Sequence, residues 1–92
     1  MKKIYIAGKI TENPTFQEDF KVVADREEEK GNKVMNPAKL SGGFTQGEYM
    51  RICFAMIDAC EAILLLSNWT DSDGAKLEKA YAEKTGKKIY FE

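Results

Sequence analysis

Short apolar runs alternate along the chain with longer stretches in which apolar residues recur every three or four positions. The runs predict strands over residues 3–7, 33–37, 62–66 and 87–91, and the periodic stretches predict helices over 16–30, 48–60 and about 73–84. Because strands and helices alternate, we expect a parallel sheet with helices on both faces. The prediction is a single domain over residues 1–92, a small doubly wound α/β fold of flavodoxin-like or Rossmann-like type, with the order β-α-β-α-β-α-β.

The helix predicted over residues 48–60 is apolar on nearly all sides. Such a helix must bury more than one face, and so small a domain offers little to cover the second. We therefore expect a homodimer or a higher homo-oligomer through this helix. In the helix predicted from about residue 73, Leu77, Ala80 and Tyr81 form the expected inner face.

Composition limits the chemistry that the chain can perform. It has 14 basic and 15 acidic residues, a net charge of -1, and no histidine. This charge balance argues against a nucleic-acid polymer as partner. Without histidine, acid–base or nucleophilic roles fall to carboxylate, tyrosine, lysine or cysteine. Cys53 and Cys60 are about two turns apart on one predicted helix, too far for a disulfide, and are expected to be small core residues. We expect neither a metal nor a cofactor.

The amino-terminal apolar run, Ile4 to Ala7, is only four residues long. It is too short for a signal peptide or a membrane span. We therefore expect a cytoplasmic protein that does not bind membranes, and the two unpaired cysteines agree with a reducing compartment.

Three segments follow predicted strands, at the edge where doubly wound sheets bind their ligands. Gly8 and Lys9 follow the first strand, Asn36 ends the second, and residues 67–78 follow the third. Gly8 permits a close backbone approach, whereas Lys9 either pairs with a phosphate or is simply solvated. The first segment has neither the Walker A pattern nor a dinucleotide-binding fingerprint.

The segment after the third strand contains several candidate ligand contacts. Ser72 is expected to cap the following helix, and its hydroxyl and the N–H groups near Gly74 and Ala75 can also hold an anion such as a 5′-phosphate. Trp69 is either a core anchor or an aromatic wall for a base. From periodicity alone, Glu78 is one more surface acid on a charged helix.

Several motifs together resemble the small DUF4406 proteins: Lys3-Ile4-Tyr5-Ile6-Ala7-Gly8, Gly31…Val34…Asn36-Pro37, Tyr49-Met50-Arg51, Cys60-Glu61-Ala62-Ile63 and Trp69…Ser72…Gly74-Ala75…Glu78…Ala82. These proteins are similar to nucleoside 2-deoxyribosyltransferases and 2′-deoxynucleoside 5′-monophosphate N-glycosidases, and the resemblance covers essentially the whole chain. It implies a nucleoside or nucleotide ligand. It also implies action on the N-glycosidic bond, with Glu78 as the nucleophile that forms a glycosyl ester, later resolved by water or a second base.

The resemblance also implies phosphate or sugar contacts at Gly8 and Ser72, and it places Trp69 beside the base. The chain departs from the pattern at Cys53, where related sequences resemble Tyr-Met-Arg-Arg-Asp-Leu and carry an acid. A thiol cannot replace a carboxylic acid that protonates a leaving purine.

Asp71 and Asp73 are better placed to replace this acid than Asp58, which projects about 140° away from position 53 around an ideal helix. Without the acid, two other functions stay open. The first is a nucleotide-binding or sensing module that has no turnover. The second is a structural oligomer.

Overall fold

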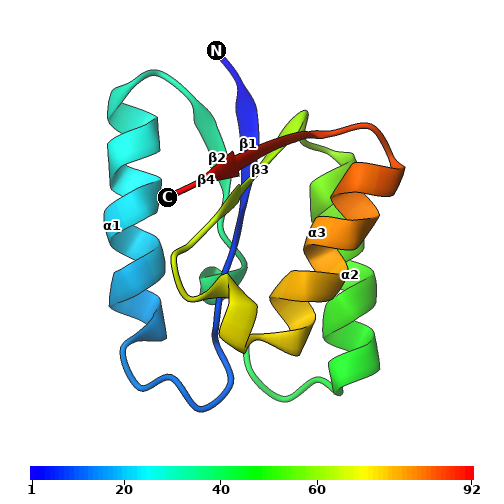
Figure 1. The fold of residues 1–92 in the computed structure, drawn as a ribbon. Coiled ribbons are helices and arrows are strands. Elements are labelled where there is room, and N and C mark those ends of the chain that lie inside the picture. Colours follow the sequence, from blue (N-terminus) through cyan, green and yellow to red (C-terminus); the bar gives the residue numbers. More distant parts are fainter.

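A computed structural model describes residues 1–92 and contains a four-stranded parallel sheet with the strand order β2-β1-β3-β4. The strands are β1 (Lys3–Ala7), β2 (Lys33–Met35), β3 (Ala62–Leu65) and β4 (Lys88–Phe91), and the helices are α1 (Phe16–Glu29), α2 (Gln46–Asp58) and α3 (Asp73–Lys84). Helix α1 covers one face of the sheet, and α2 and α3 cover the other (Figure 1). The structure thus confirms the predicted doubly wound fold. None of the three helices has the length and apolar character needed to cross a membrane.

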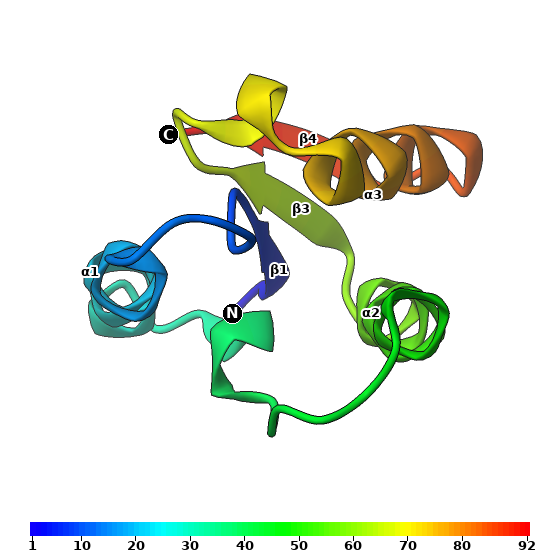
Figure 2. The same cartoon turned by 90° about the horizontal axis from the view of Figure 1, so that it is seen from below.

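Strand β1 lies between β2 and β3 and divides its side chains between the two layers. Ile4 and Ile6 pack toward α1, whereas Tyr5 and Ala7 pack toward α2 and α3. The chain leaves β1 toward β2 on one side and later reaches β3 on the other, so the strand order reverses between β1 and β3. Figure 2 views the molecule from the edge where these strands end.

Helix α2 begins and ends two residues earlier than the sequence predicts, because a capping box fixes its start. The Glu48 amide donates to Oγ1 of Thr45 at 3.2 Å, and the Thr45 amide donates to Oε1 of Glu48 at 2.8 Å. The two bonds satisfy amides that the first helical turn would leave free.

Replacing Thr45 with alanine removes one bond of this capping box, and we expect Thr45→Ala to lower the free energy of unfolding by about 1 kcal/mol. Urea denaturation measures the change. Thr70→Ala is the matched control, because Thr70 is exposed and its side chain makes no hydrogen bond. Equal stability of the two variants would show that the capping box contributes little.

Helix α2 buries much of its apolar surface within the chain. Cys53 and Ile57 face the sheet, and the Phe54 ring stacks on the Tyr81 ring of α3, with ring centroids 4.2 Å apart and planes 6° from parallel. The exposed large apolar side chains all belong to other segments: Met1, Val22, Met35, Phe44, Leu77 and Phe91. Association through α2 therefore stays a prediction.

Helix α3 turns a different face to the sheet than its apolar periodicity predicts. Ala75, Glu78 and Ala82 point inward, whereas Leu77 is 55% exposed and Ala80 is also exposed. The prediction that Leu77 and Ala80 line the inner face is wrong. With two alanines on its inner face, α3 can approach the sheet closely and still accommodate one longer side chain, that of Glu78.

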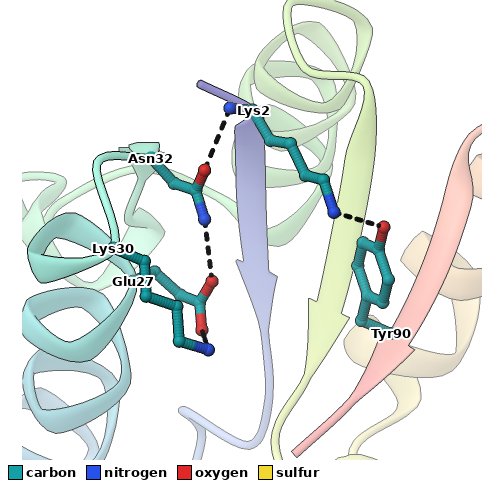
Figure 3. A network of polar contacts seen from close by, with 5 residues as sticks. All are labelled: Lys2, Glu27, Lys30, Asn32 and Tyr90. Carbon is teal, nitrogen blue, oxygen red and sulfur yellow. Dashed lines mark hydrogen bonds and ion pairs between the residues drawn. The ribbon is translucent and has the colours of Figure 1, made fainter.

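A polar network on the α1 side ties β1 to α1 and β4 (Figure 3). The Lys2 amide donates to Oδ1 of Asn32 at 3.0 Å, and its ammonium donates to the Tyr90 hydroxyl at 3.0 Å. Asn32 and Lys30 donate to the carboxylate of Glu27, which is 6% exposed. Glu27 is therefore a satisfied structural carboxylate.

Candidate functional site

A cavity of about 990 Å³ opens beyond the carboxyl ends of the central strands. Residues from three segments line it: 8–17 after β1, 37–53 after β2 and within α2, and 71–78 at the start of α3. Its volume is near the upper end of the usual range of small-molecule sites, roughly 300–1,000 Å³. The predicted ligand-binding edge of the sheet therefore contains a cavity large enough for a nucleoside.

Glu78 lines this cavity and is only 7% exposed, because α3 presents it to the sheet beside two alanines. Its Oε2 accepts a hydrogen bond from the Tyr5 hydroxyl at 2.8 Å. The Cys53 thiol lies beside the same carboxylate and also hydrogen-bonds to it. Tyr5 thus anchors a carboxylate that lines the cavity.

The environment of Glu78 changes how this carboxyl ionises. Burial raises the pKa of Glu78 from 4.5 to about 7, although the hydrogen bond from Tyr5 lowers it in part. Burial also raises the pKa of Cys53 to about 11, and burial together with the neighbouring Glu78 raises the pKa of Tyr5 well above 10. Near neutral pH, Glu78 is therefore partly ionised, whereas Tyr5 and Cys53 stay protonated.

Ser72 caps α3, as the sequence predicts. The Ala75 amide donates to Oγ of Ser72 at 3.1 Å, and Gly74 lies in the first turn beside it. Both Ser72 and Gly74 line the cavity. The first amides of α3, which have no partner inside a helix, start at this rim.

Gly8 and Lys9 also line the cavity. Packing against Leu66 explains why position 8 is a glycine. A Cβ atom at Gly8 would lie 2.7 to 2.9 Å from three side-chain atoms of Leu66. The Lys9 amide donates to Oδ1 of Asn68 at 3.0 Å, and its ammonium takes part in no ion pair. Asn68 thus fixes the loop after β1, a role that the sequence does not reveal.

Neither Asn36 nor Trp69, both candidate ligand contacts, lines the cavity, and Trp69 packs against the core on the α2 and α3 side of the sheet. The Asn36 side chain accepts from the Ala38 amide at 2.9 Å and caps the short 3₁₀ helix Pro37–Lys39. The Trp69 ring lies 5.4 Å from the ammonium of Lys79. The aromatic and apolar side chains on the cavity wall come from other positions: Ile10, Phe16, Leu40, Tyr49, Met50 and Leu77.

Tyr5, the hydrogen-bond partner of the Glu78 carboxyl, is a candidate site residue that the sequence pattern does not reveal. It is fully buried in a central strand, so its position in the chain looks like an ordinary core aromatic. Its hydroxyl was the available signal, because a buried hydroxyl requires a hydrogen-bond partner. That partner, Glu78, is 73 residues away in the sequence.

The arrangement offers one buried carboxyl that lines the cavity, and the groups beside it are the Tyr5 phenol and the Cys53 thiol. Such a carboxylate can attack an electrophilic carbon or take up a proton. Asp71 and Asp73 line the cavity but are exposed at its rim. No three Cys, Asp or Glu side chains gather to hold a metal ion.

No curated protein matches the chain in sequence. Among solved structures, it is similar to a 2-desoxiribosyltransferase from Leishmania mexicana, with 23% identity and a TM-score of 0.79. The similarity covers 99% of this chain but only 63% of that protein, and at this identity it shows a shared fold. A family model, "Domain of unknown function (DUF4406)", matches residues 2–91. The chain belongs to the DUF4406 family.

Proposed function

We propose that the protein acts on the N-glycosidic bond of a deoxynucleoside or its 5′-monophosphate, with Glu78 as the nucleophile. One observation carries the proposal: a buried carboxylate that lines the cavity is held in place by a hydrogen bond from Tyr5. An anchored carboxylate of this kind can be held against the anomeric carbon of a sugar. The similarity of fold to a 2-desoxiribosyltransferase supports the same reading.

In the first step, Oε1 of Glu78 forms a bond to C1′ of the sugar while the bond from C1′ to the base nitrogen breaks. The electron pair of that bond goes to the base, and the sugar remains as an ester of Glu78. In the second step, water or the nitrogen of another base attacks C1′. The ester bond breaks, its electron pair returns to the carboxylate, and the attacking group loses a proton to solvent.

The wall of the cavity supports a flat aromatic ligand. The Tyr49 hydroxyl donates to the Ser41 carbonyl at 2.7 Å and so holds the glycine-containing loop against α2. The Tyr49 and Phe44 rings also pack in a T-shaped arrangement, with ring centroids 5.8 Å apart. A nucleobase beside this wall would bury apolar surface while its sugar lies toward Glu78.

Incubation with a panel of deoxynucleosides and monophosphates, followed by chromatography, tests the proposal. We expect free base, or exchanged base when a second base is added. If ligands raise the melting temperature but no base is released, the site is a nucleotide-binding or sensing module instead. If no ligand changes the melting temperature either, the structural-oligomer alternative gains support.

Removing the Tyr5 hydroxyl tests the pair that holds Glu78. We expect Tyr5→Phe to reduce kcat by about tenfold to a hundredfold at neutral pH. The hydroxyl lowers the pKa of Glu78, so its loss raises that pKa further. The acid limb of the rate profile should therefore move upward by about one pH unit.

Tyr90→Phe is the matched control, because the Tyr90 hydroxyl bonds to Lys2 outside the cavity. It should leave the rate profile in place. A Tyr5→Phe profile that coincides with that of the wild type would show that the hydroxyl does not influence the ionisation of Glu78.

A further inference from the structure

The charged side chains that line the cavity, apart from Glu78, are mostly acidic. They are three carboxylates, Glu12, Asp71 and Asp73, and a single amine, Lys9. Glu12 comes from the turn after β1. Asp71 and Asp73 flank Ser72, the N-cap residue of α3. None of the three belongs to an ion pair. The cavity therefore presents net negative charge to a ligand.

This charge opposes a phosphate at the start of α3. The amides of a helix N-terminus attract anions, but Asp73 already occupies the first turn of α3, and Asp71 lies just before it. Lys9 is the only cation on the cavity wall. A phosphate with nearly two negative charges would be repelled more than attracted here. A positively charged ligand would be attracted more than repelled.

The groups that contact the Glu78 carboxyl include no acid that could protonate a departing base, and Asp71 and Asp73 stand exposed at the rim of the cavity. The two groups beside its carboxyl are the phenol of Tyr5 and the thiol of Cys53, and the pKa values of both are raised. A neutral base leaves with an extra electron pair and requires a proton in the transition state. A base that already carries a positive charge, such as an N7-alkylated purine, leaves as a neutral molecule and needs no acid.

On these two grounds, and resting on the proposed function, we infer that the cavity selects unphosphorylated N-glycosides whose base is cationic. The bond from Oε1 of Glu78 to C1′ forms as the bond from C1′ to the base nitrogen breaks. The electron pair of the broken bond goes to the base and cancels the positive charge of its ring. Water then attacks C1′, the carboxylate leaves with its electron pair, and the proton from water goes to solvent.

Binding of two nearly isosteric nucleosides to the Glu78→Gln variant tests the inference without turnover. The probes are N7-methyl-2′-deoxyguanosine, at a pH at which its ring is cationic, and 7-deaza-7-methyl-2′-deoxyguanosine, which is neutral. Calorimetry should show about tenfold tighter binding of the cationic probe, and added salt should reduce the ratio. The 5′-monophosphate of the neutral probe should bind more weakly than the neutral probe itself.

Removing the charges of Asp71 and Asp73 then tests whether these aspartates cause the preference for the cationic probe. In the Glu78→Gln background, Asp71→Asn with Asp73→Asn should reduce the preference for the cationic probe to about threefold or less. Glu28→Gln is the matched control, because Glu28 is exposed on α1, outside the cavity. Equal binding of the two probes, a preference that survives the double substitution, or tighter binding of the monophosphate would overturn the inference.

Turnover of the same nucleosides by the wild type separates this inference from the proposed function. Base released spontaneously by the cationic probe is subtracted with the Glu78→Gln variant. If the wild type releases no base above this background while the binding preference holds, Glu78 is not a nucleophile, but the ligand preference stands. If the wild type cleaves neutral nucleosides and binds the two probes equally, the proposed function stands and the inference fails.

Discussion

Glu78→Gln should abolish release of free base, with a loss of at least about a thousandfold in kcat, while the variant folds normally. The amide oxygen can still accept the hydrogen bond from Tyr5, so the side chain keeps its place. Amide oxygen is a far weaker nucleophile than carboxylate toward the anomeric carbon. Chromatographic assay of deoxynucleoside cleavage measures the loss.

The same substitution should make the protein more stable at alkaline pH. The folded-state pKa of Glu78, about 7, lies above its ordinary value of 4.5. The folded protein therefore holds this proton to a higher pH than the unfolded chain, and Glu78 reduces the free energy of unfolding progressively as pH rises from 4.5 to 7. Above pH 7, the ionised Glu78 lowers the free energy of unfolding by the full amount, about 3 kcal/mol. A glutamine at this position carries no charge and therefore causes no such loss.

Urea denaturation of both proteins across this pH range measures the difference. We expect the Glu78→Gln variant and the wild type to have similar stability below pH 4.5, the ordinary pKa of Glu78. Their stabilities should diverge as the pH approaches about 7, its pKa in the folded protein. Glu83→Gln is the control on the same helix, because Glu83 is about half exposed and paired with Lys79. A variant that cleaves substrate at the wild-type rate would remove Glu78 from the mechanism. A constant stability difference would contradict the raised pKa.

The position of Glu78 on the inner face of α3 shows what an apolar pattern alone cannot predict. Apolar periodicity assigns the inner face of α3 to Leu77 and Ala80, because a long apolar side chain normally points to the core. In the structure, Ala75 and Ala82 take that face, and Leu77 borders the cavity. Alanine occurs on inner and outer faces alike, so the pattern could not fix the rotation of the helix. The resemblance to DUF4406 proteins selects Glu78, whereas periodicity assigns it to the surface.

The order of strands and helices was predictable because each element has a strong local signal. Ala62 to Leu65 is a continuous apolar run, and Ser72 caps the helix that follows it. The pairing of Tyr5 with Glu78 has no local signal, because it depends on how α3 is rotated against β1. The same holds for Asn68, whose contact with Lys9 joins two loops that meet only once the sheet has formed.

Gly8→Ala should be strongly destabilising, with a loss of about 2 to 3 kcal/mol in the free energy of unfolding. The added Cβ would fall within 3 Å of Cβ, Cγ and Cδ1 of Leu66, which is 2% exposed. The Leu66 amide also donates to the Ala7 carbonyl at 2.8 Å, so the two strand ends cannot separate without breaking that bond. Gly42→Ala is the matched control, because a Cβ there meets no atom within 4 Å.

A double substitution identifies the cause of the destabilisation. Leu66→Ala removes Cγ and Cδ1, two of the three close atoms, so Gly8→Ala should cost less in that background than in the wild type. Independent, additive effects would contradict the clash. If the clash is confirmed, lost activity in a Gly8 variant says nothing about ligand contact by itself, because the same glycine brings the ends of β1 and β3 together. Activity must then be compared per folded molecule, at a temperature where Gly8→Ala and the wild type are both fully folded.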